Sequence, residues 1–159
     1  MSVKYTTAVI AGSFDPITFG HTDLVLRAAE IFPRIIIAVS QNTEKKYFLP
    51  YENRFNAVKA VFLGHSNVEV QKLCGLLADF VKSKNAVLVK GARNSIDFEY
   101  EKTLYDINNS LENIETIILP ARKELAYISS TFARDMIKFN RPLNGIVPPE
   151  AIEFIVKAL

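Results

Sequence analysis

Residues 8–21 read AVIAGSFDPITFGH, and three kinds of segment follow one another in them. An apolar run stops at Gly12, a loop rich in turn-forming residues comes next, and an amphipathic segment begins at His21-Thr22-Asp23. This order predicts a strand, a turn and a helix start. Such an arrangement builds a phosphate site, because the free N–H groups and the dipole of a helix N-terminus attract anions. Gly12 and Gly20 lack a Cβ and let the main chain approach a ligand, although the pattern is neither G-x-G-x-x-G nor a loop ending in G-K-[ST].

The rest of the chain alternates apolar, β-branched runs with helical patterns. We expect strands at residues 7–11, 34–40, 68–73, 86–90 and 116–119, and helices at 22–32, 51–63, 75–84 and 97–111. Such alternation is typical of a parallel sheet whose strands are buried on both faces. Two more helices are expected at residues 130–139 and 149–158. The predicted fold class is therefore α/β: a doubly wound five-stranded parallel sheet with C-terminal helices, in a single domain over residues 1–159.

Composition limits the possible partners and compartment. The chain has 159 residues, of which 49% are apolar, and a net charge of +2, so a nucleic-acid partner is not expected and any basic site must be local. The one cysteine, Cys74, cannot form an internal disulfide and fits a reducing compartment. We expect it to be a small core residue. Neither a signal peptide nor a membrane span is expected, and we predict a soluble cytoplasmic protein.

Polar residues follow most of the expected strands. Ser13 follows the first, and Lys45-Lys46 follow the second, in a segment, 41–50, that we expect to be a mobile loop. The fourth strand ends in Lys90-Gly91-Ala92-Arg93, and the fifth is followed by Ile128-Ser129-Ser130-Thr131. Because the carboxyl ends of parallel strands meet at one edge, several cations, hydroxyls and two helix N-termini should surround one cleft. The sequence therefore predicts a polyphosphate site.

Two of these motifs resemble those of a known superfamily. Thr18-Phe19-Gly20-His21 resembles the (H/T)-x-G-H motif of the nucleotidyltransferases, and residues 128–134, ISSTFAR, resemble their I-S-S-[ST]-x-x-[RK] motif. The fuller resemblance is to the bacterial phosphopantetheine adenylyltransferase family. That family has G-[ST]-F-D-P-[IV]-T-x-G-H, here residues 12–21, and [KR]-G-x-R followed by D-F-E-Y-E, here residues 90–93 and 97–101. The resemblance covers nearly the whole chain and implies a Rossmann-like nucleotidyltransferase fold.

The resemblance implies an activity and a set of site residues. Members of the family join ATP and 4′-phosphopantetheine by direct attack on the α-phosphate, giving dephospho-coenzyme A and pyrophosphate in coenzyme A biosynthesis. By the family pattern the catalytic residues are His21 and Lys45. The implied ATP contacts are Ser13, Phe14, His21, Gly91, Ala92, Arg93, Glu101, Leu125, Ala126, Tyr127, Ile128, Ser129, Ser130 and Thr131. The implied contacts to 4′-phosphopantetheine are Ser13, Lys45, Leu77 and Lys90.

The resemblance also implies a cofactor and an assembly. Magnesium is expected on the triphosphate oxygens, with no metal ligand from the protein, because no cluster of acidic residues offers a dedicated cage. Family members are typically hexamers, so a homo-oligomer is expected, without nucleic-acid or membrane partners. Three positions depart from the usual pattern: Lys90 stands where Arg is usual, Thr131 replaces a serine, and Arg134 stands where many members have Lys.

Other interpretations of the same residues stay open from the sequence. A cytidylyltransferase or a nicotinamide-mononucleotide adenylyltransferase would keep the superfamily but change the substrate. A nucleotide-binding regulatory module would bind without turnover. Several residues of the predicted site have a purely structural alternative. His21 could be a helix-start residue satisfied by backbone, Lys45-Lys46 a solvated loop, and residues 129–131 a helix cap. Asp97 and Glu99 could form an acidic first turn, Asp15 could bond to the backbone of its own loop, and His65 could be a surface turn residue.

Overall fold

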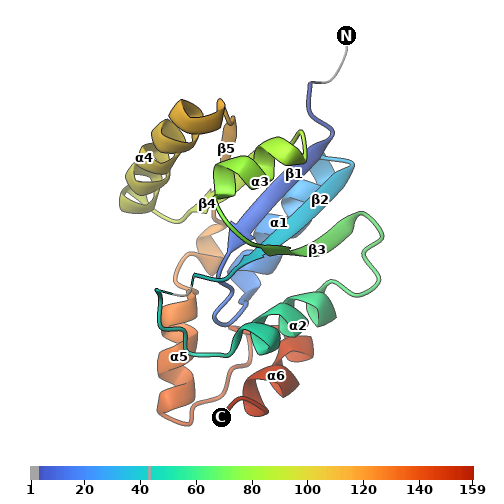
Figure 1. Ribbon diagram of the computed structural model, residues 1–159. Coiled ribbons are helices and arrows are strands. Elements are labelled where there is room, and N and C mark those ends of the chain that lie inside the picture. Colours follow the sequence, from blue (N-terminus) through green and yellow to red (C-terminus); the bar gives the residue numbers. More distant parts are fainter. Residues whose placement is uncertain (1–3, 43) are drawn as a thin grey trace.

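A five-stranded parallel sheet in the order β3-β2-β1-β4-β5 forms the centre of the computed structural model, which describes residues 4–42 and 44–159 (Figure 1). The strands are β1 Thr7–Gly12, β2 Arg34–Ser40, β3 Val68–Leu73, β4 Val87–Ala92 and β5 Thr116–Pro120. The helices are α1 Phe19–Ile31, α2 Tyr51–Val61, α3 Leu77–Ser83, α4 Ser95–Glu112, α5 Ser130–Lys138 and α6 Pro149–Val156, with a 3-10 turn η1 at Lys123–Leu125. The predicted doubly wound α/β fold is confirmed.

Helices cover the sheet on both faces, and each face has its own apolar core. On one face, alternate residues of the central strands, such as Ile10 and Ile37, pack against α1, α2, α5 and α6. On the other face, Val9, Ile36 and Leu88 pack against α3. Because successive strand residues point to opposite faces, a run such as Ile35-Ile36-Ile37 supplies both cores. This is the physical reason for the near-continuous apolar strands.

The strand order places the switch point of the sheet between β1 and β4. Strand β1 pairs with β2 on one side, from Thr7 opposite Arg34 to Gly12 opposite Val39, and with β4 on the other. Burial on both faces, predicted for all five strands, holds for the central ones. It is wrong for β3 and β5, whose residues are nearly all half-buried or exposed, because both are edge strands with fewer neighbours.

Helix α1 begins three residues earlier than predicted. Thr18 has an extended backbone, with φ −131° and ψ 167°, and its carbonyl oxygen accepts from the N–H of Thr22 at 3.1 Å. His21 is therefore the third residue inside the helix rather than its first. Val25 and Ala28 face the core, whereas Ile31, at the end of the helix, is 57% exposed.

Helix α4 lies at the side of the sheet and has no buried residue. Its start is capped by Asn94, whose side chain accepts from the N–H of Asp97 at 2.9 Å, and it ends at Asn113 in the left-handed region. Several of its large apolar side chains are exposed, with Phe98, Ile107 and Leu111 at 48%, 49% and 54%. Among the described residues, no helix has the length and apolar character needed to cross a bilayer.

Candidate active site

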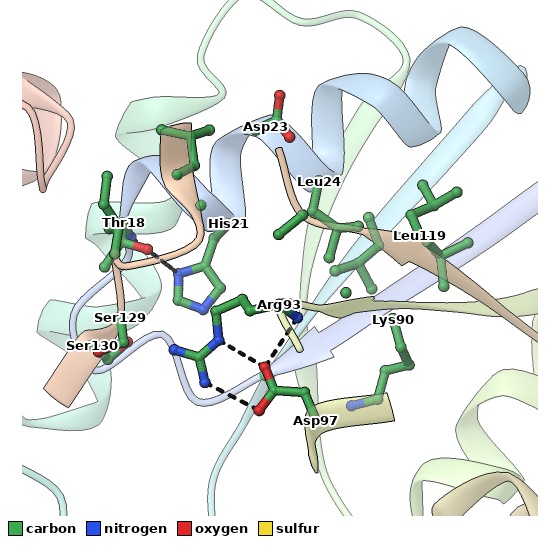
Figure 2. Close-up of a pocket in the computed structure, with 18 of the residues that line it drawn as sticks. Thr18, His21, Asp23, Leu24, Lys90, Arg93, Asp97, Leu119, Ser129 and Ser130 are labelled. Carbon is green, nitrogen blue, oxygen red and sulfur yellow. Dashed lines mark hydrogen bonds and ion pairs between the residues drawn. The ribbon is translucent and has the colours of Figure 1, made fainter. Parts of the chain in front are cut away.

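A cleft of about 420 Å³ opens where β1 and β4 end, at the switch point of the sheet (Figure 2). Its walls come from the start of α1, the end of β4, the first turns of α4 and the segment that leads into α5. Ligands of open α/β sheets bind at this position. The two helix N-termini expected there, those of α1 and α5, both contribute residues to it.

The structure brings together most of the residues that the sequence assigned to the nucleotide. The predicted residues that line the cleft are Phe14, His21, Lys90, Gly91, Arg93, Glu101, Leu125, Ile128, Ser129, Ser130 and Thr131. Gly91 lets the side chain of Leu24 pack closely against the end of β4, because a Cβ on Gly91 would lie 3.3 Å from Cδ2 of Leu24.

The remaining predicted residues lie outside the cleft wall. Ser13, Ala92, Ala126 and Tyr127 are chain neighbours of lining residues but do not line the cleft themselves. Lys45 lines a separate cavity of about 380 Å³, together with Tyr47, Tyr51 and Arg54. Leu77 packs at the edge of the apolar core under α3. Most of the residues predicted to contact ATP therefore line one cleft. Of the residues predicted for the second substrate, Lys90 lines this cleft and Ser13, Lys45 and Leu77 do not.

One hydrogen bond fixes the orientation and the tautomer of His21. The backbone N–H of Thr18 donates to Nδ1 of His21 at 3.0 Å. A nitrogen that accepts from an N–H carries no proton, so in the neutral ring the proton is on Nε2. Figure 2 shows this other nitrogen turned toward Arg93 inside the cleft. The two interpretations of His21 are thus compatible, since one ring nitrogen caps the helix start and the other offers a donor to the cleft.

The surroundings keep that imidazole neutral. Burial, followed by the positive charge of Arg93, lowers the pKa of His21 from 6.5 to about 4. The ring centroid of Phe14 lies 5.1 Å from that of His21 and contributes to the apolar surroundings. At neutral pH His21 is therefore a neutral donor through Nε2–H.

Every cation that lines the cleft is paired with a carboxylate that also lines it. Lys90 Nζ lies 3.3 Å from Oε2 of Glu101, at an angle that makes an ion pair but not a hydrogen bond. The guanidinium of Arg93 donates to both carboxylate oxygens of Asp97, at 2.7 and 3.3 Å. These hydrogen bonds hold the pKa of Asp97 below its usual value. Arg27 pairs with Asp23 at 3.3 Å.

Cations are present in the cleft as expected, but each of them is paired. The three cationic side chains that line it, Arg27, Lys90 and Arg93, are balanced by three carboxylates. The positive character of the cleft then comes largely from the N-termini of α1 and α5, whose N–H groups and dipoles carry partial positive charge. A phosphate that binds Lys90 or Arg93 must compete with the carboxylate already there.

The second motif holds the loop that follows β1. Ser129 caps α5 by accepting from the N–H of Phe132 at 3.0 Å, and Ser130 Oγ donates to the carbonyl oxygen of Pro16 at 2.8 Å. Arg134 donates to the carbonyl oxygen of Asp15 at 2.7 Å and to Thr131 Oγ1 at 2.9 Å. The two motifs, about 110 residues apart in sequence, therefore support one another directly.

Several lining residues were not predicted, among them Asp23, Leu24, Arg27, Tyr100, Leu119 and Ala121. Leu24 lies three residues beyond His21, a spacing that places two side chains on one face of a helix, so this signal was available. Leu119 and Ala121 had no comparable signal. Together with Leu125 and Ile128, the side chains of Leu24, Leu119 and Ala121 make one wall of the cleft apolar. Such a wall suits the flat face of a nucleobase.

Two structural expectations need correction. Cys74 is exposed rather than buried, because it follows the last residue of an edge strand. Asp15 is buried, but its carboxylate accepts from the N–H groups of Phe48 and Leu49, both at 2.8 Å, and not from its own loop.

Within the described residues there is no group of three His, Cys, Asp or Glu side chains that could hold a metal ion.

Comparisons with known proteins agree with this geometry. The family described as cytidylyltransferase-like matches residues 9–136. The chain is 41% identical over 155 residues to a phosphopantetheine adenylyltransferase of Clostridium botulinum, covering 96% of this chain and 94% of the relative. It is 40% identical over 144 residues to one of Geotalea daltonii, covering 89% of each. A solved Vibrio parahaemolyticus structure, described as that of a nicotinate-nucleotide adenylyltransferase, superposes with a TM-score of 0.70 at 18% identity, over 96% of this chain and 93% of that one.

Proposed function

The chain belongs to the phosphopantetheine adenylyltransferase family of cytidylyltransferase-like nucleotidyltransferases, and we propose that it transfers the adenylyl group of ATP to 4′-phosphopantetheine. The products are dephospho-coenzyme A and pyrophosphate. The observation that carries this proposal is the shared cleft, in which the neutral donor His21 lies beside Arg93 and the hydroxyls of residues 129–131. The whole-chain identity to enzymes of this name supports the choice of substrates.

The proposed reaction is a direct in-line displacement. A phosphate oxygen of 4′-phosphopantetheine forms a bond to the α-phosphorus of ATP, and the bond from that phosphorus to the oxygen bridging to the β-phosphate breaks. Pyrophosphate leaves with the electron pair. Negative charge grows on the α-phosphate oxygens, where a fixed donor is most effective in the transition state. The Nε2–H of His21 is the donor that we assign to this role.

The other side chains of the cleft would bind and orient the nucleotide. We assign the base to the apolar wall and to residues 125–128. The triphosphate is assigned to the loop at Ser13 and Phe14, to residues 91–93 and to the start of α5 at residues 129–131. Glu101 completes the nucleotide contacts in the family pattern. The carboxylate of Glu101 forms an ion pair with Lys90. A nucleotide that binds Glu101 must therefore share this carboxylate with Lys90 or displace the lysine.

We assign the phosphate of 4′-phosphopantetheine to Ser13, Lys45 and Lys90, and its pantetheine arm to Leu77. Lys45 lies in a separate cavity, so this assignment requires the segment 41–47 to move toward the cleft when the substrates bind. A moving segment that completes a site after binding is a common device in transferases.

Magnesium fits this site as an ion carried by the nucleotide. The carboxylates that line the cleft, Asp23, Asp97 and Glu101, are all engaged by cations, so the described chain offers hydroxyls rather than an acidic cage. The ion would be held by the triphosphate oxygens and by water, as its preference for retained water allows. Bound there, it would neutralise charge on the triphosphate.

A homo-oligomer, with the hexamer as its expected form, is also part of the proposal. Helix α4 exposes a row of large apolar side chains, among them Phe98, Ile107 and Leu111. An exposed apolar surface of this kind is typical of a protein–protein interface. We further propose that the enzyme works in the cytoplasm, where its single exposed cysteine would stay reduced.

A pyrophosphate-release assay tests the function. The purified protein is offered ATP or CTP, each with 4′-phosphopantetheine, nicotinamide mononucleotide or glycerol phosphate, in the presence of magnesium. We expect release with ATP and 4′-phosphopantetheine, and mass spectrometry should identify dephospho-coenzyme A. Release with another acceptor alone would move the protein to another transferase, and no release in any arm would favour a regulatory module.

A further inference from the structure

Arg54 is a fully buried arginine for which the proposed reaction has no use. It lies on α2, one helical turn before the core residue Val58, and its side chain is 0% exposed. No carboxylate of the described residues forms an ion pair with it. Burial lowers the pKa of Arg54, and the nearby charge of Asp15 opposes that shift without forming an ion pair. Because a buried charge is costly, the hydrogen bonds of this guanidinium are important for keeping it in place.

The guanidinium joins three separate segments. Its Nη1 donates to the carbonyl oxygen of Ser13 in the loop after β1, and to that of Ser40 at the end of β2 at 3.0 Å. Its Nε donates to the carbonyl oxygen of Leu49, which ends the segment carrying Lys45, at 3.3 Å. The loop after β1 and the end of the segment at Leu49 are joined a second time, because the Asp15 carboxylate accepts from the N–H groups of Phe48 and Leu49.

The loop that Arg54 holds contains an unusual backbone conformation. Phe14 has a φ of +49°, in the left-handed region that bulky residues rarely adopt. The carbonyl groups on either side of it, those of Ser13 and Asp15, accept from Arg54 and Arg134 respectively. Such a conformation persists only where its surroundings impose it. The two arginines therefore fix the loop that presents Phe14 to the cleft.

A second path leads from Arg54 to Lys45. The guanidinium carbon lies 3.9 Å from the ring centroid of Tyr47, a stacking contact. The hydroxyl of Tyr47 accepts from the N–H of Asn42 at 3.0 Å, and the carbonyl of Asn42 accepts from the N–H of Lys45 at 3.1 Å. The turn that carries Lys45 is thus supported by Tyr47, and Tyr47 is supported by Arg54.

We propose that Arg54 is a positioning residue, which holds the left-handed loop at Phe14 in a fixed relation to Ser40 and Leu49, the two ends of the segment that carries Lys45. The segment between them can then bring Lys45 toward the cleft from a defined starting position. This inference rests on the proposed function, because it concerns groups assigned to the triphosphate and to the acceptor phosphate. Arg54 itself touches neither. A fixed relation matters because misplacing reacting groups by about 1 Å can lower a rate on the order of 100-fold.

The test compares Arg54→Lys and Tyr47→Leu with Val58→Ala. Lysine keeps the charge of Arg54 but cannot reach three carbonyl groups in a fork or stack on Tyr47 in the same way. Val58→Ala is the control, because it removes buried volume from the same helix, and Val58 lines neither the cleft nor the cavity at Lys45. We expect Arg54→Lys to lower kcat on the order of 10- to 100-fold, with KM for ATP changed less than threefold. Tyr47→Leu should lower kcat less, and Val58→Ala should keep kcat at a temperature well below its Tm.

A double-mutant cycle separates positioning from general stability. In a Lys45→Ala background, Arg54→Lys should have a smaller effect on kcat than in the parent, because one of the groups that it positions is already gone. Equal effects in the two backgrounds, or an unchanged kcat in Arg54→Lys, would overturn the proposal.

A third measurement keeps the inference distinguishable from the proposed function. If the parent releases no pyrophosphate, the function is wrong, and amide hydrogen exchange still tests Arg54. Arg54→Lys should accelerate exchange at both residues 13–15 and residues 44–49, whereas Val58→Ala should not. Unchanged exchange in those two segments would refute the positioning role without reference to activity.

Discussion

The N–H of Thr18 donates to Nδ1 of His21 at 3.0 Å, and this one bond decides what His21 can do. It commits Nδ1 as an acceptor and leaves the proton on Nε2. Because the pKa of His21 is lowered to about 4, the ring stays neutral at physiological pH and acts as a hydrogen-bond donor rather than as a cation.

His21→Ala should lower kcat on the order of 10²- to 10³-fold and change KM for ATP much less, because the lost donor acts mainly on charge that develops in the transition state. The measurement is steady-state pyrophosphate release. His65→Ala is the matched control, since His65 is the other histidine of the chain, is exposed and does not line the cleft. A His21→Ala enzyme that turns over at the parent rate would remove His21 from the mechanism.

The titration of His21 should be visible by NMR of the imidazole group. The folded-state pKa of about 4 lies below the ordinary histidine value of 6.5, so between these values the unfolded chain binds more protons than the folded one. The resulting contribution to stability is fully present above pH 6.5 and is lost as the pH falls through 4. Arg93→Gln should raise the pKa of His21 only part of the way, because burial is the larger cause. His65→Gln assigns the two imidazole signals, and a midpoint near 6.5 for His21 would contradict the assigned environment.

The segment 41–50, predicted to be a mobile loop, can now be divided. Asp15 already holds the N–H groups of Phe48 and Leu49, so its movable part is confined to residues 41–47, of which Thr43 lies outside the described residues. We expect amide exchange at residues 44–47 to slow when ATP and 4′-phosphopantetheine are both bound, while residues 48–49 are slow in both states. Equal exchange at residues 44–47 with and without the substrates would argue against closure.

Helix α4 provides a prediction about assembly. Ile107→Asp or Leu111→Asp should shift the protein toward smaller species in sedimentation or light scattering, because a charge would have to be buried in the proposed interface. Leu63→Asp is the control, since Leu63 is 86% exposed but lies on a turn away from α4. If the parent protein is already a monomer, the proposal of an oligomer fails.

How far the sequence could predict the site depended on whether a feature was local. The strand, turn and helix around Gly12 and His21 are set by neighbouring residues, and their type and order were predicted correctly, although the helix begins three residues earlier than expected. Exposure of Cys74 depends on β3 being an edge strand, which no local pattern specifies. Neutralisation of the cations in the cleft could not be predicted from the sequence either, because the ion pair of Lys90 with Glu101 depends on how α4 packs beside β4.

Arg54 shows the opposite case, in which a local signal existed. It shares a helical face with Val58, so it is an arginine on the apolar side of an amphipathic helix. That position predicts burial, but its partners Ser13 and Ser40 belong to segments far away in the sequence. Only the sheet order brings the ends of β1 and β2 together over the start of α2.

Lys90 carries the last prediction. It is the main departure from the family pattern, and in the free protein it is an ion-pair partner of Glu101, with side chains 17% and 14% exposed. Arginine would offer a planar fork for a phosphate, and lysine offers a compact point charge. Lys90→Ala should therefore raise KM for 4′-phosphopantetheine well above any change in KM for ATP, and Lys90→Arg should be tolerated.

The ion pair complicates Lys90→Ala, because the change also leaves the partly buried carboxylate of Glu101 without its cation. Loss of one partner of such a pair costs stability. The double variant Lys90→Ala/Glu101→Gln removes that charge and should regain much of the Tm lost in the single variant. It should not regain the KM for 4′-phosphopantetheine, because the cation that binds the acceptor phosphate is still missing. Recovery of both quantities together would mean that Lys90 serves only to neutralise Glu101, and an unchanged KM for 4′-phosphopantetheine in Lys90→Ala would exclude it from the acceptor site.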